Sequence, residues 1–167
     1  DDFLKLLPKM KSDNIPNIIV LIGGVYENNK MLKNNNEQAI YWLKRAFEDF
    51  SIIESGESLA IRYMQTKQYK KAYEIYTQLE CLNHHAIFNA LGTFYRKGLY
   101  VKKDTEKALY YHKKAFKGGN LSAPMKIAKI YFLKGKFIKS LKLYLKAVKL
   151  RYKESKKNPD SELLRER

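Results

Sequence analysis

Residues 91–116 read LGTFYRKGLYVKKDTEKALYYHKKAF, and this stretch decides the fold. In each half of it, apolar and aromatic residues recur at spacings of three, four and seven, which is the period of an amphipathic helix. Gly92 and Ala108 are the small residues of these two stripes, so two helix backbones can approach closely there. Between the stripes, Gly98 suits the left-handed backbone that ends a helix, and Asp104 is a preferred helix N-cap. The stretch therefore predicts two helices joined by a short loop.

The same pattern returns along the chain. A shift of 69 positions aligns Gly23 with Gly92 and Ala39 with Ala108, and each of these long units divides into two shorter ones. The small anchor residues of the second helices then recur about every 34 positions, at Ala39, Ala72, Ala108 and Ser140. Self-similarity at this period indicates four tandem helix pairs.

We expect an all-α fold in which antiparallel helix pairs stack into a solenoid of about four repeats. The predicted helices cover residues 15–28, 36–50, 56–66, 69–81, 84–97, 105–117, 121–134 and 137–152. The array is predicted at 14–152, with repeats at about 15–50, 53–82, 84–119 and 120–152. Residues 1–13 form a predicted N-terminal cap segment, and residues 153–167 are either a C-terminal cap helix or the truncated start of another repeat.

The composition is that of a folded, basic protein. The chain has 167 residues, of which 45% are hydrophobic and 13% aromatic, so a disordered tail is excluded. Residues 1–83 carry 11 basic and 11 acidic side chains, whereas residues 84–167 carry 22 basic and 6 acidic ones and supply the whole net charge of +16. Such a basic half favours an acidic partner, namely nucleic acid, anionic lipid or an acidic protein segment. The alternative is that the lysines only solvate the outer faces of helices.

Little in the sequence indicates where the protein acts. Its longest apolar run, residues 18–26, is about half of the roughly 20 residues that a membrane span requires. The single cysteine, Cys81, excludes an intrachain disulfide framework and favours a reducing, cytoplasmic compartment. The sequence begins with Asp1 and lacks a signal-peptide pattern, so we expect a trimmed N-terminus from which targeting information is missing.

Residues 91–115, with Gly98, Asp104 and Ala108 at their places, resemble the Sel-one-like repeat. This repeat is a close relative of the tetratricopeptide repeat and has a longer loop between its two helices. Residues 23–46 resemble it in weaker form, and the second and fourth pairs, with shorter loops, resemble ordinary tetratricopeptide repeats. Tyr100 stands where the Sel-one-like pattern usually has a second glycine, and Ser140 replaces the usual alanine.

The resemblance implies a right-handed superhelix that acts as a non-catalytic scaffold or adaptor and binds a partner peptide or protein segment on its concave face. In such proteins the first helix of each pair lines that groove. The matching positions are Val20, Gly24 and Glu27 in the first pair, Ile61 and Met64 in the second, Asn89, Thr93 and Arg96 in the third, and Met125, Lys129 and Phe132 in the fourth. The polar members are candidates for holding an acidic group, and the apolar members for pockets beside it. Alternatively, the polar residues are only hydrated and the apolar ones pack between repeats.

The last predicted helix carries a second candidate site. Its lysines recur at spacings of three and four, opposite an apolar side formed by Phe137, Leu141, Tyr144 and Val148. The basic outer patch consists of Lys139, Lys142, Lys146 and Lys149. Such a patch suits a phosphate-rich polymer, and the alternative function is that of an RNA-binding helical-repeat protein similar to the pentatricopeptide readers. The other interpretation is a solvated outer face of the last repeat.

No pattern indicates catalysis. A tetrahedral zinc site would need all four cysteine and histidine residues of the chain, Cys81, His84, His85 and His112. We interpret them instead as a buried cysteine beside two exposed turn histidines, with His112 in an aromatic slot of the core. The sequence has no phosphate-cradling glycine loop or nucleophile elbow, and its carboxylates are scattered. We therefore predict no catalytic residues, no metal and no cofactor.

Overall fold

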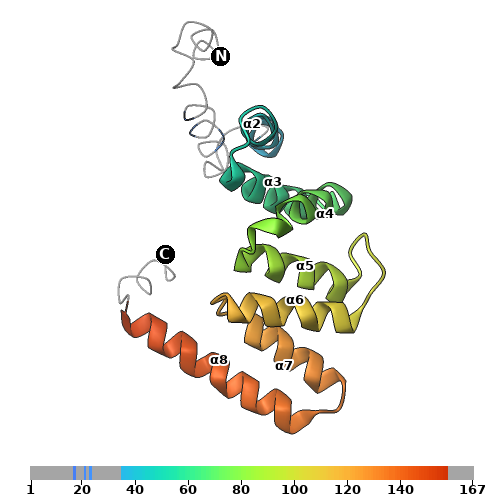
Figure 1. Ribbon diagram of the computed structural model, residues 1–167, viewed down its shortest axis with the longest axis vertical. Coiled ribbons are helices and arrows are strands. Elements are labelled where there is room, and N and C mark those ends of the chain that lie inside the picture. The colour runs from blue at the N-terminus through green and yellow to red at the C-terminus, as the bar shows by residue number, and fades with distance from the viewer. Residues whose placement is uncertain (1–16, 18–20, 22, 24–34, 158–167) are drawn as a thin grey trace, which may run out of the picture. The chain divides into compact units, whose positions relative to one another are not determined.

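The computed structural model of the chain describes residues 17, 21, 23 and 35–157 (Figure 1). Residues 35–157 fold into the α-helices α2 (Asn35–Glu48), α3 (Ile53–Gln65), α4 (Tyr69–Gln78), α5 (His85–Lys97), α6 (Thr105–Lys117), α7 (Ala123–Leu133) and α8 (Phe137–Lys157), with a 3-10 helix, η4 (Leu79–Leu82), after α4. The predicted cap segment 1–13, residues 158–167 and most of the predicted helix 15–28 lie outside the described residues.

The predicted helix boundaries agree closely with the observed ones where the chain is described. The helices of residues 91–116 begin and end within one residue of their predicted limits. α4 is shorter than predicted because its last turn tightens into η4, and α8 extends to Lys157 instead of ending at 152. Among the described helices, none has the length and hydropathy that a membrane crossing requires.

The chain divides into two compact units, Asp1–Leu79 and Glu80–Arg167. In the first unit α2 packs on α3, and α3 packs on α4. Small side chains lie where these helices meet: Ala39, Ala60 and Ala72 are fully buried, and Leu59 is 1% exposed. This arrangement follows from the sequence stripes, because alanine lets paired backbones approach closely.

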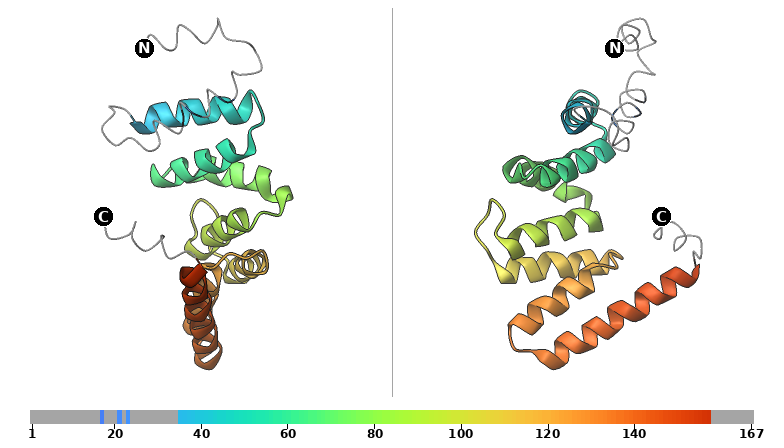
Figure 2. Two further views of the ribbon diagram at one scale, coloured as in Figure 1. Left: turned by 90° about the vertical axis from the view of Figure 1, so that its left-hand side faces the viewer. Right: turned by 180° about the vertical axis from the view of Figure 1, so that it is seen from behind.

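In the second unit α5 pairs with α6 and α7 pairs with α8, and α6 also packs on α7, so that the two pairs stack (Figure 2). Ala108 and Leu109 of α6 share one buried cluster with Ile127 and Ile130 of α7. The all-α fold of sequentially packed helix pairs is therefore confirmed, whereas the hand of the superhelix stays a prediction.

The loop between α5 and α6 has the predicted helix-ending residues. Gly98 ends α5 in the left-handed region with a φ of 69°, and the Asp104 side chain accepts a hydrogen bond from the backbone N–H of Lys107 at 2.9 Å. Tyr100, at the place of the missing second glycine, also has a left-handed φ of 61°. A residue with a β-carbon is strained there. The loop therefore keeps a backbone that glycine would favour, although tyrosine occupies the position.

Among the described residues, the predicted core stripes are buried or half-buried except at Tyr144. In each second helix, the position four residues after the small anchor residue is called the slot here. It holds Leu43, Tyr76 or His112 in the first three pairs, and each of these side chains is buried. Tyr144 occupies the same slot in the fourth pair and is 49% exposed. The fourth pair is thus the place where the repeat pattern predicts a covered surface and the described residues leave it open.

Candidate functional site

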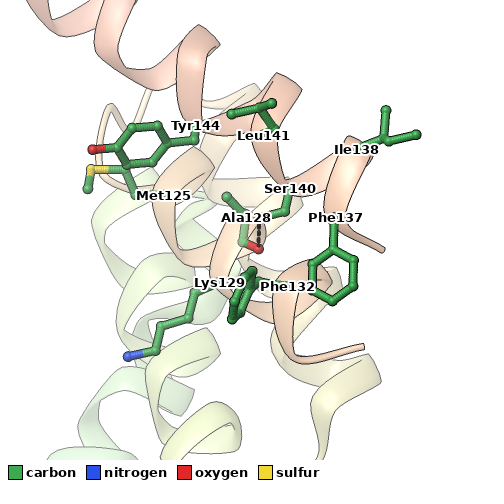
Figure 3. Close-up of a pocket in the computed structure, with 9 residues that line it drawn as sticks. All are labelled: Met125, Ala128, Lys129, Phe132, Phe137, Ile138, Ser140, Leu141 and Tyr144. Carbon is green, nitrogen blue, oxygen red and sulfur yellow. Dashed lines mark hydrogen bonds between the residues drawn. The ribbon is translucent and has the colours of Figure 1, made fainter. Parts of the chain in front are cut away.

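A pocket of about 590 Å³ opens between α7 and α8 (Figure 3). Its walls are almost entirely apolar, and one cation lies at their edge. The lining residues are Met125, Ala128, Lys129, Phe132, Phe137, Ile138, Ser140, Leu141 and Tyr144. The volume lies within the range of sites that bind organic ligands or partner side chains, about 300–1,000 Å³.

Small residues hold the two helices together at the base of the pocket. Ser140 Oγ donates a hydrogen bond to the backbone carbonyl of Ala128 at 2.8 Å, which fixes α8 against α7 (Figure 3). Gly135, with a left-handed φ of 68°, makes the turn between them. The helices meet closely at Ser140, so the larger side chains on either side of this contact form the walls.

The walls leave much apolar surface in water. Phe132 is 58% exposed, Ile138 74% and Leu141 60%. The rings of Phe132 and Phe137 pack edge to face with their centroids 5.3 Å apart, so the mouth of the pocket is shaped by packed aromatic side chains. Beyond the pocket, α8 continues the surface with Leu145, which is also exposed. A contiguous apolar surface of this kind is typical of an interaction site.

Cations border the apolar surface. Lys129 is exposed and directs its ammonium group away from the centre of the pocket (Figure 3). Arg151 of α8 donates through Nη1 to the Met125 sulfur at 3.6 Å, which holds its guanidinium at this surface. Lys142 and Lys149 are exposed on α8. The site therefore combines apolar walls with positive charge at its edges.

The pocket brings together three of the predicted groove residues, Met125, Lys129 and Phe132, on one face of α7. Sequence reasoning missed the pocket residues of α8 because it placed the groove on first helices alone. The sequence contained one usable signal for them. The apolar side of α8 is wider than the single stripe that packing between helices requires, because it also includes Ile138 and Leu145.

The predicted groove residues of the third pair lie against α7. Lys126 Nζ donates to Asn89 Oδ1 at 2.9 Å and to Thr93 Oγ1 at 3.2 Å, and Asn89 Nδ2 donates to Ser122 Oγ at 3.3 Å. Burial lowers the pKa of the Lys126 ammonium, and the nearby charge of Arg96 lowers this pKa further. Asn89 and Thr93 thus contact the following repeat, and two cations lie near each other beside them.

The remaining predicted groove residues lie elsewhere. Ile61 is 45% exposed on α3, and Met64 is half-buried on the same helix. Val20, Gly24 and Glu27 lie outside the described residues. The first unit has its own pocket of about 280 Å³, lined by Lys44, Phe47, Glu48, Leu59, Tyr63, Lys71, Glu74, Ile75 and Gln78. Charged residues of both signs line it, and Lys44 pairs with Glu48 at 3.6 Å, so it lacks the apolar character of the pocket between α7 and α8.

The basic outer patch lies on α8, next to the apolar surface. Lys139, Lys142 and Lys149 are exposed. The Lys146 ammonium lies 5.0 Å from the centroid of the Phe116 ring, a distance at which the ring attracts the cation. The patch and the apolar surface therefore belong to the same helix.

The cysteine and histidine residues do not form a metal site within the described part of the chain. Cys81 is exposed, and the prediction that it is buried is wrong, because η4 turns this segment toward the surface. His112 is fully buried in the core, as predicted. Burial, followed by the charges of Lys126 and Arg96, lowers the pKa of His112 to about 3, so its ring is neutral at pH 7.

The sequence pattern of the Sel1 repeat matches residues 22–49 and 89–120. Among solved structures, MamA superposes with a TM-score of 0.70 at 19% identity, over 92% of this chain and 87% of that one. A Sel1 repeat protein from Oxalobacter formigenes superposes with a TM-score of 0.67 at 20% identity, over 84% of this chain. Residues 41 to the end of MamA from Desulfovibrio magneticus RS-1 give a TM-score of 0.65 at 14% identity, over 84% of this chain and 77% of that one.

These likenesses establish the fold alone. Sequence identities at this level do not carry a partner from one protein to another. The chain spans 61% of the length of the Oxalobacter formigenes protein. No curated protein sequence matches this chain.

Proposed function

Because this chain is a Sel1 repeat protein with the fold of tetratricopeptide proteins such as MamA, we propose that it is a non-catalytic scaffold that binds a segment of another protein. Repeats of this kind typically mediate protein–protein interactions, and they are usually not catalytic. The binding surface in this proposal is the surface around Met125, Lys129 and Phe132 of α7.

The observation that carries the proposal is the apolar pocket between α7 and α8. Surface of this kind is stabilised when a partner removes it from water, by roughly 25 cal/mol for each Å² that is buried. Exposed aromatic residues in a pocket are the side chains that most often dominate the energy of a protein interface. Phe132 has this character, and Lys129 beside it supplies a donor for a carboxylate of the partner.

Site-specific photo-cross-linking tests the proposal. A benzophenone amino acid placed at Phe132 should form protease-sensitive adducts with a protein in extracts of the source cell. The matched control places the same amino acid at Tyr110, an exposed aromatic residue of α6 outside the pocket, and should give no such adducts. The absence of protein adducts specific to position 132 would contradict the proposal.

RNA binding is the second candidate, because Lys139, Lys142 and Lys149 are exposed side by side on α8. In that case adducts at position 132 would be sensitive to ribonuclease, and the affinity would fall steeply with salt. Binding through the groove predicts a shallow salt dependence. It also predicts that the double variant Arg96→Ala/Lys129→Ala loses the partner while the triple variant Lys139→Ala/Lys142→Ala/Lys146→Ala keeps it.

A further inference from the structure

The second unit contains one example of a helix seated on a helix pair. α7 lies against the pair α5–α6, where Leu109 packs with Ile127 and Ile130 of α7 and is 8% exposed. Its Lys126 inserts among polar acceptors on α5, Asn89 and Thr93. α7 supplies Ile127 and Ile130 to this contact, and α8 adds Leu143.

The corresponding face of the pair α7–α8 is open in the part of the chain that the structure describes. The repeat places Leu141 where the third pair has Leu109, and Tyr144 where it has His112. These residues are 60% and 49% exposed. The two helices pair closely below them, since Ser140 Oγ donates to the carbonyl of Ala128. The face therefore exposes Leu141, the equivalent of the residue that packs against α7 in the third pair.

We infer that this face binds an amphipathic α-helix of a partner protein, with an apolar stripe flanked by acidic residues, in the way that α7 lies on α5–α6. The inference rests on the proposed function and names the chemistry of the partner. Leu141, Tyr144 and Val148 recur along α8 at spacings of three and four. A ridge with this spacing packs against apolar residues at the same spacing on another helix.

The residues that replace the polar acceptors specify the charge of the occupant. Met125 and Lys129 occupy the positions of Asn89 and Thr93. A second helix like α7 would direct its own lysine at a thioether and an ammonium group, where it finds no good acceptor and meets a like charge. A glutamate or aspartate at that place would instead accept a hydrogen bond from Lys129.

The surrounding charge has the same sign. Residues 107–153 contain 14 lysine and arginine residues and no aspartate or glutamate. Of these, Arg151 lies on the Met125 side of the apolar surface and Lys142 on the outer side of α8. An occupant with acidic residues on both sides of its apolar stripe is complementary to this arrangement, whereas a second copy of the chain, with its net charge of +16, is repelled.

Other occupants fit the surface less well. Nucleic acid would leave the aliphatic side chains of Ile138, Leu141 and Leu145 without apolar contacts. A lipid bilayer is contacted by a convex apolar face, whereas Ile138 and Leu141 line a concave pocket. Residues 158–167 offer only two large apolar residues, Leu163 and Leu164, to a surface with many more.

Fluorescence anisotropy with designed peptides tests the inference on the full chain. The probe is a labelled helical peptide of about 18 residues with leucine at i, i+3, i+4 and i+7 and glutamate on both flanks. One comparison peptide has lysine in place of every glutamate, and another has the acidic sequence scrambled. We expect the acidic helix to bind at least about tenfold more tightly than either comparison peptide at low salt.

The variants Phe132→Asn and Leu141→Asn should each weaken the acidic peptide about tenfold or more, and the control Tyr110→Asn should change its affinity less than about twofold. All three residues are more than half exposed, so the variants are expected to fold, and circular dichroism checks this. Equal binding of the three peptides, or no binding at all, would overturn the inference. If cross-linking from position 132 still yields a protein, the proposed function stands and only the acidic helix is wrong.

Each rival occupant gives its own contrary result. Binding of the chain to vesicles of phosphatidylcholine and phosphatidylserine that Leu141→Asn abolishes, without peptide binding, would identify a membrane. A dimer in sedimentation velocity that Leu141→Asn dissociates would identify a second copy. Tighter peptide binding by Leu163→Ser/Leu164→Ser, with weak binding by the unmodified chain, would show that residues 158–167 occupy the face. Each of these results overturns the inference.

Discussion

The third and fourth helix pairs share one sequence pattern but have different surfaces. On α6, Leu109 and His112 are buried, and Leu109 packs with Ile127 and Ile130 of α7. On α8, Leu141 and Tyr144 hold the same places and are about half exposed or more. The pairing of the two helices is alike in both, with small residues at the point of contact.

The difference teaches that a helix pair in this fold does not bury its own apolar surface completely. The second helices of the first and third pairs also pack on the first helix of the following pair, α2 on α3 and α6 on α7. A residue of the repeat stripe is therefore a core residue or a binding residue according to what lies over it. In our proposal, Met125 and Lys129 determine which partner helix binds.

Matched truncations of the two leucines should show the largest contrast. Leu109→Ala removes a buried side chain that contacts Ile127 and Ile130 and should lower the free energy of unfolding by about 2–4 kcal/mol. Leu141→Ala removes an exposed side chain and should cost less than about 0.5 kcal/mol. Urea denaturation of both variants provides the measurement. Equal losses would mean that the face of α8 is covered in the free protein.

The buried slot of the third pair should make stability depend on pH. In the folded protein the pKa of His112 is lowered to about 3. In the unfolded state this histidine binds a proton near pH 6.5, at which the folded protein binds none there. Stability contributed by this group is complete above pH 7 and is lost as the pH falls toward 3. Between pH 7 and pH 5 the loss should be about 2 kcal/mol.

The variant His112→Leu provides the control for this titration, since the first repeat has leucine in the same slot. Urea denaturation at pH 7 and pH 5 should show a smaller loss for His112→Leu than for the unmodified protein. An unchanged pH dependence would assign the titration to other groups and would contradict the neutral, buried state of His112.

The third and fourth pairs should also differ in whether the contact between their helices tolerates a β-carbon on the first helix. A β-carbon at Gly92 would lie 2.7 Å from Nδ1 of the buried His112, so Gly92→Ala should destabilise by about 1–2 kcal/mol despite the better helix propensity of alanine. The fourth pair already has Ala128 at this position. Thermal denaturation should show that Gly92→Ala costs less in a His112→Ala background than in the unmodified chain. An equal cost in both backgrounds would rule out the clash as the cause.

The two turns within these pairs give the smallest contrast. Tyr100→Gly should stabilise the protein by about 1 kcal/mol, because glycine adopts the left-handed φ of 61° without strain. Gly135→Ala, at a φ of 68° in the turn before α8, should destabilise it by a similar amount. Melting temperatures that move in opposite directions would agree with this account. A loss of stability in Tyr100→Gly would mean that the tyrosine side chain contributes more than its backbone costs.

The sequence predicted the helix pairs well because local rules determine them. The stripe around Gly92 and Ala108, the cap at Asp104 and the left-handed Gly98 are all encoded within a few residues of where they act. The exposure of Tyr144 was not predictable in this way, since the same residue type at Tyr76 is buried. The repeat pattern alone therefore does not decide whether this position is buried.

The candidate site was predictable in part. Met125, Lys129 and Phe132 followed from the resemblance to groove-forming repeats, whereas Asn89 and Thr93, chosen by the same rule, contact Lys126 of the next helix. Position within a repeat identifies the face of a helix, but it does not distinguish a partner from the neighbouring repeat. The contribution of Ile138 and Leu141 required coordinates, because it arises where α8 meets α7.

The most direct test of a docking face on the fourth pair is the NMR spectrum of methyl-labelled methionine. The chain has four methionines, of which Met125 lines the pocket and Met64 is the predicted groove methionine of the first unit. Variants with leucine at either position assign the signals of these two residues. Addition of a saturating acidic helical peptide should shift the Met125 methyl resonance of the unmodified chain. The same addition should leave this resonance in place in Leu141→Asn. A Met125 signal that stays in place while the peptide is bound would contradict the account.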